Sequence, residues 1–226
     1  MNFTVNLKGQ VNQMRLPKSK ALWPLFETVV NAIQSLEETK DCVNPCITVI
    51  ANRSIEQQMN ISGEEELSHF EEFIVTDNGE GFTERNYKSF LEAYTTYKIQ
   101  KGCKGIGRFL WLKAFNEIEI KSIYTEGGKW YQREFVFSIK KTIDPEDNKK
   151  EINAPKDGDR ITTIRLLGFQ AYYRDEVALS LESLVKKVIE HCLPYFIVEG
   201  CPDIIGFNHK FCVMADSGHI PSDSHP

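Results

Sequence analysis

Apolar residues recur along this chain with two periods, and these periods predict its helices and strands. Helical spacing is clearest near the start, where Pro24 stands at a position that the first turn of a helix tolerates. The apolar positions of this first helix are Leu22, Leu25, Phe26, Val29, Val30, Ile33 and Leu36. Further helices are expected over 108–116 and 175–192, and Thr83 can cap another that runs to about Tyr94.

Shorter apolar runs, bounded by polar or glycine-rich stretches, predict extended segments. These are expected at 3–7, 47–50, 73–76, 117–124, 130–140 and 160–167. Residues 52–72 are polar and acidic and predict a surface hairpin or loop, while the charged segment 144–159 predicts an exposed connection. Because several strands follow one another, the pattern indicates an α+β fold with helices on one face of a mixed sheet.

Composition limits the classes of protein that this chain can belong to. Its 226 residues and 41% hydrophobic content allow one large domain or two small ones. The net charge of -5 argues against a general nucleic-acid surface, although a local basic patch is still compatible with it. We expect no signal peptide, because the first residues lack a charged region followed by a long apolar core. We also expect no membrane span, because no apolar run approaches ~18 residues. The six cysteines form no C-x-x-C pair, so their spacing does not predict a zinc site. We expect a cytoplasmic protein with reduced cysteines.

A glycine motif follows the apolar run that ends at Val75. Asp77 begins the sequence D-N-G-E-G-F, in which Gly79 and Gly81 are one residue apart and Phe82 is last. A carboxylate at a strand end followed by such glycines lets backbone approach a ligand closely. By itself the hexapeptide is also ordinary turn chemistry.

Two other segments make a site more probable than a turn. Glu27 and Asn31 are four residues apart and share a helix face that carries none of the main apolar positions. On that helix alone they would simply be its solvated side. Gly102, Gly105 and Gly107 form a G-x-x-G-x-G loop before a helix, where successive backbone N–H groups can bind an anion. The loop is neither a Walker A motif nor a convincing Rossmann motif.

In this order the segments resemble the boxes of the GHKL ATPase superfamily, which includes gyrase-type topoisomerases, ninety-kilodalton heat-shock chaperones, sensor histidine kinases and MutL. The N-box resembles 27–35, the first glycine box 77–82, the second 102–109 and the last about 158–166. The resemblance implies a Bergerat fold, a two-layer α/β sandwich with an ATP lid at about 83–104. It further implies an ATP-binding domain over 1–215, either as the N-terminal part of a larger protein or as a naturally minimal protein. Residues 216–226 are rich in Ser, Asp, His and Pro, which predicts a disordered tail.

The resemblance also assigns roles to individual residues. Asn31 would hold Mg²⁺, a cation that takes oxygen ligands and keeps several waters. Glu27 would orient or deprotonate the attacking water. Asp77 would accept a hydrogen bond from the exocyclic amine of adenine, and Thr162 would offer a hydroxyl from the strand beneath the nucleotide. The other expected nucleotide contacts are Gly79, Gly81, Phe82, Lys98, Gly102, Lys104, Gly105, Ile106, Gly107, Arg108 and Phe109.

These roles imply an ATP-hydrolysing switch, in which Mg²⁺ and ATP drive lid closure or ATP-dependent homodimerisation and slow hydrolysis resets it. Two departures from the family pattern leave alternatives open: Gln34 replaces an Asp in the N-box, and Ile161 replaces a Gly in the last box. One alternative is a non-catalytic nucleotide sensor or scaffold. The other is the ATPase domain of a MutL-like or topoisomerase-like DNA-processing protein. Expected partners are ATP and ADP, downstream domains or a client protein, and no membrane.

Overall fold

The computed structural model describes residues 7–39, 41–42, 44–54, 58–59, 65–66, 68–92, 107–140, 148–197 and 210–216. The strands of its main sheet are β1 (Cys46–Arg53), β4 (Phe70–Asp77), β5 (Phe115–Glu126), β6 (Lys129–Phe137), β7 (Lys149–Ile152), β8 (Ile161–Phe169) and β9 (Lys210–Asp216). They form a seven-stranded sheet in the order β7-β6-β5-β8-β4-β1-β9. Neighbouring strands are antiparallel except β1 and β9, which run parallel, so the sheet is mixed as expected.

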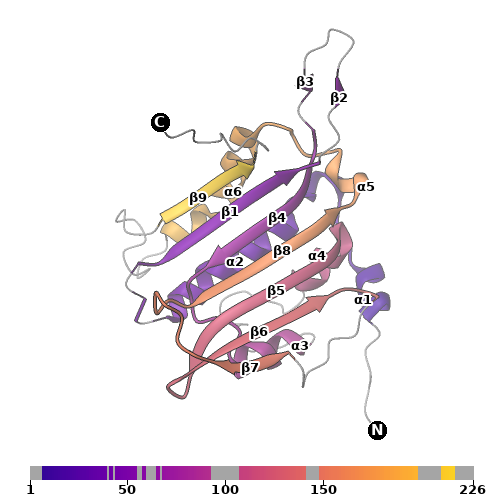
Figure 1. The fold of residues 1–226 in the computed structure, drawn as a ribbon. Coiled ribbons are helices and arrows are strands. Elements are labelled where there is room, and N and C mark those ends of the chain that lie inside the picture. Colours follow the sequence, from indigo (N-terminus) through magenta and orange to yellow (C-terminus); the bar gives the residue numbers. More distant parts are fainter. Residues whose placement is uncertain are drawn as a thin grey trace, which may run out of the picture.

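The helices are α1 (Leu7–Gln13), the 3-10 turn η1 (Lys18–Lys20), α2 (Trp23–Glu38), α3 (Glu84–Leu91), α4 (Gly107–Ala114), α5 (Ala171–Arg174) and α6 (Leu181–Ile197). Figure 1 shows α2, α4 and α6 behind the sheet, on one of its faces. The α+β class with helices on one face of a mixed sheet is therefore confirmed. None of the described helices has the length and apolar character that crossing a bilayer requires.

The core lies between the sheet and this helix layer. Strands β4, β5 and β8 alternate buried and half-exposed positions, so that their buried residues share the helix-covered face. Phe73, Phe115 and Phe169 meet there, with the last two rings stacked 4.6 Å apart. From the other side α2 buries Leu25 and Val29. The apolar period of α2 thus finds its partner surface on the strands.

Most of the expected elements are present. Helix α2 contains the first predicted helix and has Pro24 in its first turn, and Thr83 caps α3 by accepting a hydrogen bond from Asn86 N. Residues 52–72 contain a two-stranded antiparallel hairpin of β2 (Gln58–Met59) and β3 (Glu65–Glu66), as predicted.

Two predictions in the first and middle parts of the chain were wrong. Leu7 does not end a strand but begins α1, which buries Val11 one helical turn later; residues 3–6 lie outside the described part. The segment 144–159 is not only a connection, because it contains β7, an edge strand paired with β6. Its residues are mostly charged, as is common on sheet edges, so no apolar alternation announced it.

The C-terminal predictions also need correction. The helix expected over 175–192 begins only at Leu181. The preceding residue, Ser180, caps it, because its hydroxyl accepts a hydrogen bond from Ser183 N. Val177 belongs to the preceding connection, where it is buried. Asp216, placed at the start of a disordered tail, is the last residue of β9, which pairs with β1. Residues 217–226 lie outside the described part.

Candidate functional site

A row of polar residues crosses the helix-covered face of the sheet, one from each of five neighbouring strands. Asp77 ends β4 and pairs with Thr162 on β8, which pairs in turn with Ser122 on β5. Ser122 pairs with Arg133 on β6, and Arg133 pairs with Lys149 on β7. We call these five residues the polar row. Its first four members are buried, at 5%, 4%, 0% and 1% exposure respectively, in a region where alternation would place apolar side chains.

Asp77 holds the first glycine box in shape. One of its carboxylate oxygens accepts a hydrogen bond from Gly79 N at 2.9 Å, which closes an Asx-type turn. The next residue, Asn78, fixes the loop before β1: its Oδ1 accepts from Cys46 N and its Nδ2 donates to Asn44 O, each at 2.8 Å. The box therefore has a fixed path at the end of β4.

The two glycines of this box lie where a side chain would collide. A Cβ at Gly79 would overlap Ser35 of α2. Gly81 has φ of +77°, and a Cβ there would lie 2.8 Å from Ser122 Oγ and 2.9 Å from Tyr124 Cβ. Gly81 is thus required both by its backbone conformation and by close approach to the polar row.

One face of α2 joins the two glycine boxes. Glu27, Asn31 and Ser35 are spaced by four residues and are all half-exposed, so they lie one above another on the same face. Ser35 contacts the first box, and its carbonyl accepts a hydrogen bond from Glu80 N at 3.4 Å. At the other end Glu27 reaches Gly107, where a Cβ would lie 2.5 Å from Glu27 Oε2. The rise of a helix puts these ends about 12 Å apart, with Asn31 between them.

Burial raises the pKa of the Glu27 carboxyl above its ordinary value. A carboxylate with a raised pKa is a stronger base, and its position beside the first residue of α4 places it against the second glycine box. The sequence-based expectation that Glu27 and Asn31 share a face away from the apolar stripe is confirmed.

Arg108 and the two phenylalanines of the boxes make structural contacts. The Arg108 guanidinium donates to the carbonyl oxygens of Ser89, at 3.3 Å, and Glu92, so it ties α4 to the end of α3. Burial lowers its pKa to about 10, which leaves it charged at neutral pH. Phe109 is buried, and the Phe82 ring lies edge-on to an aromatic neighbour on β6.

Several predicted site residues cannot be placed. Lys98, Gly102, Lys104, Gly105 and Ile106 lie outside the described residues, as does most of the expected lid at about 83–104. Of the second glycine box only the part from Gly107 onward is described.

Sequence analysis missed Ser122, although a signal for it existed. The buried positions of β5 alternate as Ile118, Ile120, Ser122 and Tyr124, so a small hydroxyl stands where the pattern demands an apolar side chain. Its hydroxyl lies 2.8 Å from Thr162 Oγ1 and accepts a hydrogen bond from Phe82 N at 3.0 Å. Ser122 therefore joins the last box to the first.

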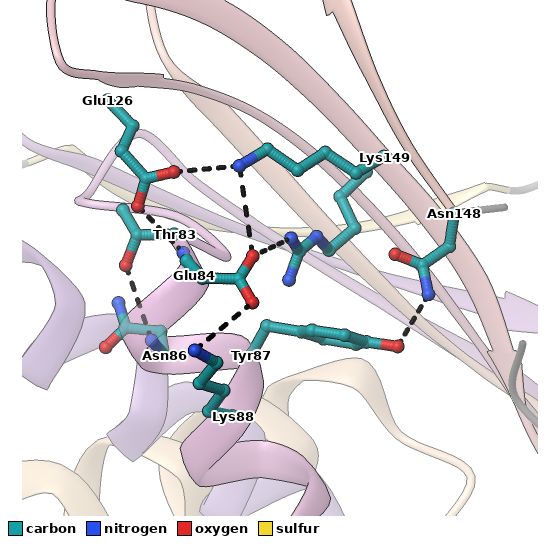
Figure 2. A network of polar contacts seen from close by, with 9 residues as sticks. Thr83, Glu84, Asn86, Tyr87, Lys88, Glu126, Asn148 and Lys149 are labelled. Atoms are coloured by element: carbon teal, nitrogen blue, oxygen red, sulfur yellow. Dashed lines mark hydrogen bonds and ion pairs between the residues drawn. The ribbon is translucent and has the colours of Figure 1, made fainter. Parts of the chain in front are cut away.

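The last two residues of the polar row, Arg133 and Lys149, form a second cluster with Glu84 and Glu126. We call these four residues the α3 network. Arg133 Nη2 donates to Glu84 Oε2 at 2.8 Å, and its guanidinium stacks 3.9 Å from the ring of Tyr87. Figure 2 shows Lys149 reaching both Glu84 and Glu126. The distances from Lys149 Nζ to their carboxylate oxygens are 3.8 and 2.9 Å respectively. Glu126 also accepts a hydrogen bond from Glu84 N. These contacts attach the start of α3 to β5, β6 and β7.

Within the described ranges, no three His, Cys, Asp or Glu side chains gather as a metal site. The one residue expected to hold a metal, Asn31, would instead contribute an amide oxygen beside ligand phosphates. Comparison with known proteins found no matching family model and no curated protein with matching sequence. The features of this chain that bear on its function are therefore the polar row and the α2 face of Glu27, Asn31 and Ser35.

Proposed function

We propose that the chain is a GHKL-type ATPase module with a Bergerat fold, which binds Mg²⁺ and ATP and hydrolyses ATP slowly. The observation that carries the proposal is the arrangement of the two glycine boxes at opposite ends of one α2 face. The first box, with Asp77, lies at the Ser35 end, and Gly107 lies at the Glu27 end. This separation of about 12 Å suits an extended nucleoside triphosphate, with its base at one end and its phosphates at the other.

The base end is suited to adenine. An ionised Asp77 can only accept hydrogen bonds, and the exocyclic amine of adenine donates, whereas the corresponding group of guanine is a carbonyl oxygen. Gly81 lets backbone pass close to the polar row, where a larger residue would fill the space. Thr162, directly opposite Asp77, adds a hydroxyl to the same end.

The phosphate end is suited to hydrolysis. Mg²⁺ bound with the phosphates would neutralise their charge, and Asn31, midway along the α2 face, offers it an amide oxygen. The raised pKa of Glu27 makes this carboxylate a better base toward a water molecule that attacks the γ-phosphate. The N-terminus of α4 beside Glu27 contributes backbone N–H groups and a helix dipole that favour an anion.

Hydrolysis would reset a conformational or dimerisation switch rather than produce a metabolite. The lid expected at about 83–104 includes α3, so nucleotide binding at the polar row is close to the helix with which the lid begins. We therefore expect slow turnover that a partner or a second copy of the chain accelerates.

The test is steady-state hydrolysis of Mg²⁺-ATP by the wild type and by Glu27→Ala, with ATP affinity measured in parallel. We expect Glu27→Ala to bind ATP with nearly unchanged affinity and to lose turnover by about 100-fold or more, the usual contribution of a general base. Glu37→Ala is the matched control, because Glu37 lies on the same helix but on another face. It should retain both properties.

Each other outcome has a definite meaning. Binding without turnover in the wild type would favour a nucleotide sensor over an ATPase. Equal loss of turnover in both variants would contradict the role given to Glu27. Absence of ATP binding by the folded wild-type protein would overturn the proposal as a whole.

A further inference from the structure

Ser122 lies between the first glycine box and the last box, which contains Thr162. It is fully buried at 0% exposure, and its Oγ accepts a hydrogen bond from Phe82 N at 3.0 Å. The same Oγ lies 2.8 Å from Thr162 Oγ1, a distance typical of one hydroxyl donating to another. Thr162 pairs with Asp77 on one side and with Ser122 on the other, so β8 separates the strand of Ser122 from the strand of Asp77.

The direction of this hydroxyl pair determines what Thr162 can offer. A hydroxyl has one proton and two lone pairs. If Thr162 donates to Ser122, Thr162 presents only lone pairs to a ligand. If Ser122 donates to Thr162, the Thr162 proton is available to a ligand acceptor.

The Phe82 N–H group favours the second direction. A hydroxyl oxygen that accepts a hydrogen bond becomes a better donor, because hydrogen bonds in a chain polarise one another. The chain then runs from Phe82 N–H to Ser122 O–H to Thr162 O–H and on to the ligand. In the alternative direction, the buried Ser122 oxygen would accept two hydrogen bonds.

We propose that Ser122 is a positioning residue that makes Thr162 a hydrogen-bond donor and so sets the base preference of the site; this rests on the proposed ATP-binding function. Asp77 accepts and Thr162 donates, side by side at the end of paired strands. The Watson–Crick edge of adenine has the complementary order, an amine donor beside the N1 acceptor. That of guanine has the reverse order, a carbonyl acceptor beside an N1–H donor. The Thr162 proton reaches N1 directly or through a bridging water.

The experiment compares ATP with 1-deaza-ATP, in which N1 is replaced by C–H and can no longer accept a hydrogen bond. The wild type should bind ATP about 10-fold more tightly, the usual worth of one hydrogen bond in a buried site. In Ser122→Ala the Thr162 hydroxyl keeps its own proton but loses the partner that orients it. We expect affinity for ATP to fall about 3-fold, a fraction of one hydrogen bond, and affinity for 1-deaza-ATP to change little, so that the preference narrows. Thr162→Val removes the donor itself and should abolish the preference, and the double variant should lose nothing further.

Ser138→Ala is the matched control, since Ser138 is also buried, at 2% exposure, but follows the last residue of β6, away from the polar row. It should keep the wild-type preference for ATP. If Ser122→Ala does not fold, Ser122→Cys fills similar space with a weak donor and should show a reduced preference.

A preference for ATP that stays as large as that of the wild type in a folded Ser122→Ala or Ser122→Cys would overturn the proposal, as would additive losses in the double variant. Both results would leave the ATPase proposal intact. Absence of ATP binding by the wild type would overturn the two together, so the two failures are distinguishable.

Discussion

The two halves of the polar row are built from different chemistry, although they lie on the same sheet face. At the Asp77 end the neighbours are the hydroxyls of Thr162 and Ser122 and the backbone of the first glycine box. At the Lys149 end four ionised groups are matched, two acidic and two basic, in ion pairs of 2.8 to 3.8 Å. One half places a carboxylate beside hydroxyls and glycine-box backbone, and the other pairs acidic with basic side chains.

This difference suits the Asp77 end to ligand binding and the α3 network to holding the fold together. A buried charge is tolerated when it is paired, so the α3 network can hold α3 against the sheet without a ligand. A carboxylate beside hydroxyls and backbone accepts hydrogen bonds directionally, which suits a base that donates a hydrogen bond. We therefore expect changes at the Asp77 end to affect ligand binding most and changes in the α3 network to affect stability most.

The largest expected effect is on binding. Asp77→Asn replaces an acceptor with a group that also donates, and we expect ATP affinity to fall by about 100-fold, or about 2.7 kcal/mol. Calorimetric titration with Mg²⁺-ATP measures it, with the exposed Asp175→Asn as control. Equal affinity in the two variants would remove the distinction between the halves of the row.

The α3 network should show the reverse behaviour. Glu84→Gln removes the charge that pairs with buried Arg133, whose Nε and Nη1 have no hydrogen-bond partner among the described residues. Losing one partner of a buried pair costs about 3–5 kcal/mol, and because Glu84 is 44% exposed we expect a smaller loss, about 2 kcal/mol of unfolding free energy. ATP affinity should change less than about 2-fold, which corresponds to a few tenths of a kcal/mol.

Glu134→Gln is the matched control for this variant. Glu134 follows Arg133 on β6 but forms its ion pair with Lys121 at the surface, where both side chains are about half exposed, at 57% and 48%. Such pairs contribute less than about 1 kcal/mol. Denaturant unfolding of the two variants would contradict the assignment if Glu134→Gln cost as much as Glu84→Gln.

Glycines offer a finer comparison between a crowded and an open turn. Gly81→Ala and Gly127→Ala both force a side chain into a positive φ, of +77° and +59°, at a cost of about 1–2 kcal/mol. A Cβ at Gly127 meets nothing within 4 Å, whereas at Gly81 it collides with Ser122 and Tyr124. We expect Gly81→Ala to be less stable than Gly127→Ala by about 1 kcal/mol, and to lose ATP binding as well.

The parts of this molecule that sequence predicts best are those with a strong local pattern. The α2 period and the run before Asp77 each follow from local hydrophobicity, and the shared face of Glu27 and Asn31 follows from helix geometry alone. The edge strand β7 could not be predicted from a local pattern, because its charged residues are stabilised by pairing with β6 rather than by burial. The start of α6 was misplaced because Val177 continues its apolar period while lying in the connection before it.

The arrangement of the polar row could not be predicted from local sequence patterns either. Asp77 and Thr162 were singled out as separate motifs, 85 positions apart in the numbering. Their direct pairing is a property of strand register, and so is the insertion of Ser122 between Thr162 and Arg133. Register depends on contacts between distant segments, which no local period encodes.

The smallest expected effect is a pH signature with opposite sign at Glu27 and Glu84. Burial raises the pKa of Glu27, so the folded state binds its proton more tightly than the unfolded state does. Ionisation then costs stability, and the cost is absent below the ordinary value of 4.5 and develops as pH rises through the folded-state pKa. Glu27→Gln should therefore gain stability relative to the wild type between acidic and neutral pH.

Glu84 should behave in the opposite way. Its hydrogen bond to Arg133 lowers the pKa of its carboxyl, so the ionised form is favoured by folding. That contribution is complete above 4.5 and is lost as pH falls through the folded-state pKa, so the stability deficit of Glu84→Gln should shrink on acidification. Unfolding free energies of both variants and the wild type, measured across this range, check the two signs together. If both variants drifted in the same direction with pH, Glu27 would be paired in the way that Glu84 is, and the contrast between a residue held ready for chemistry and one held in place by its partners would not hold.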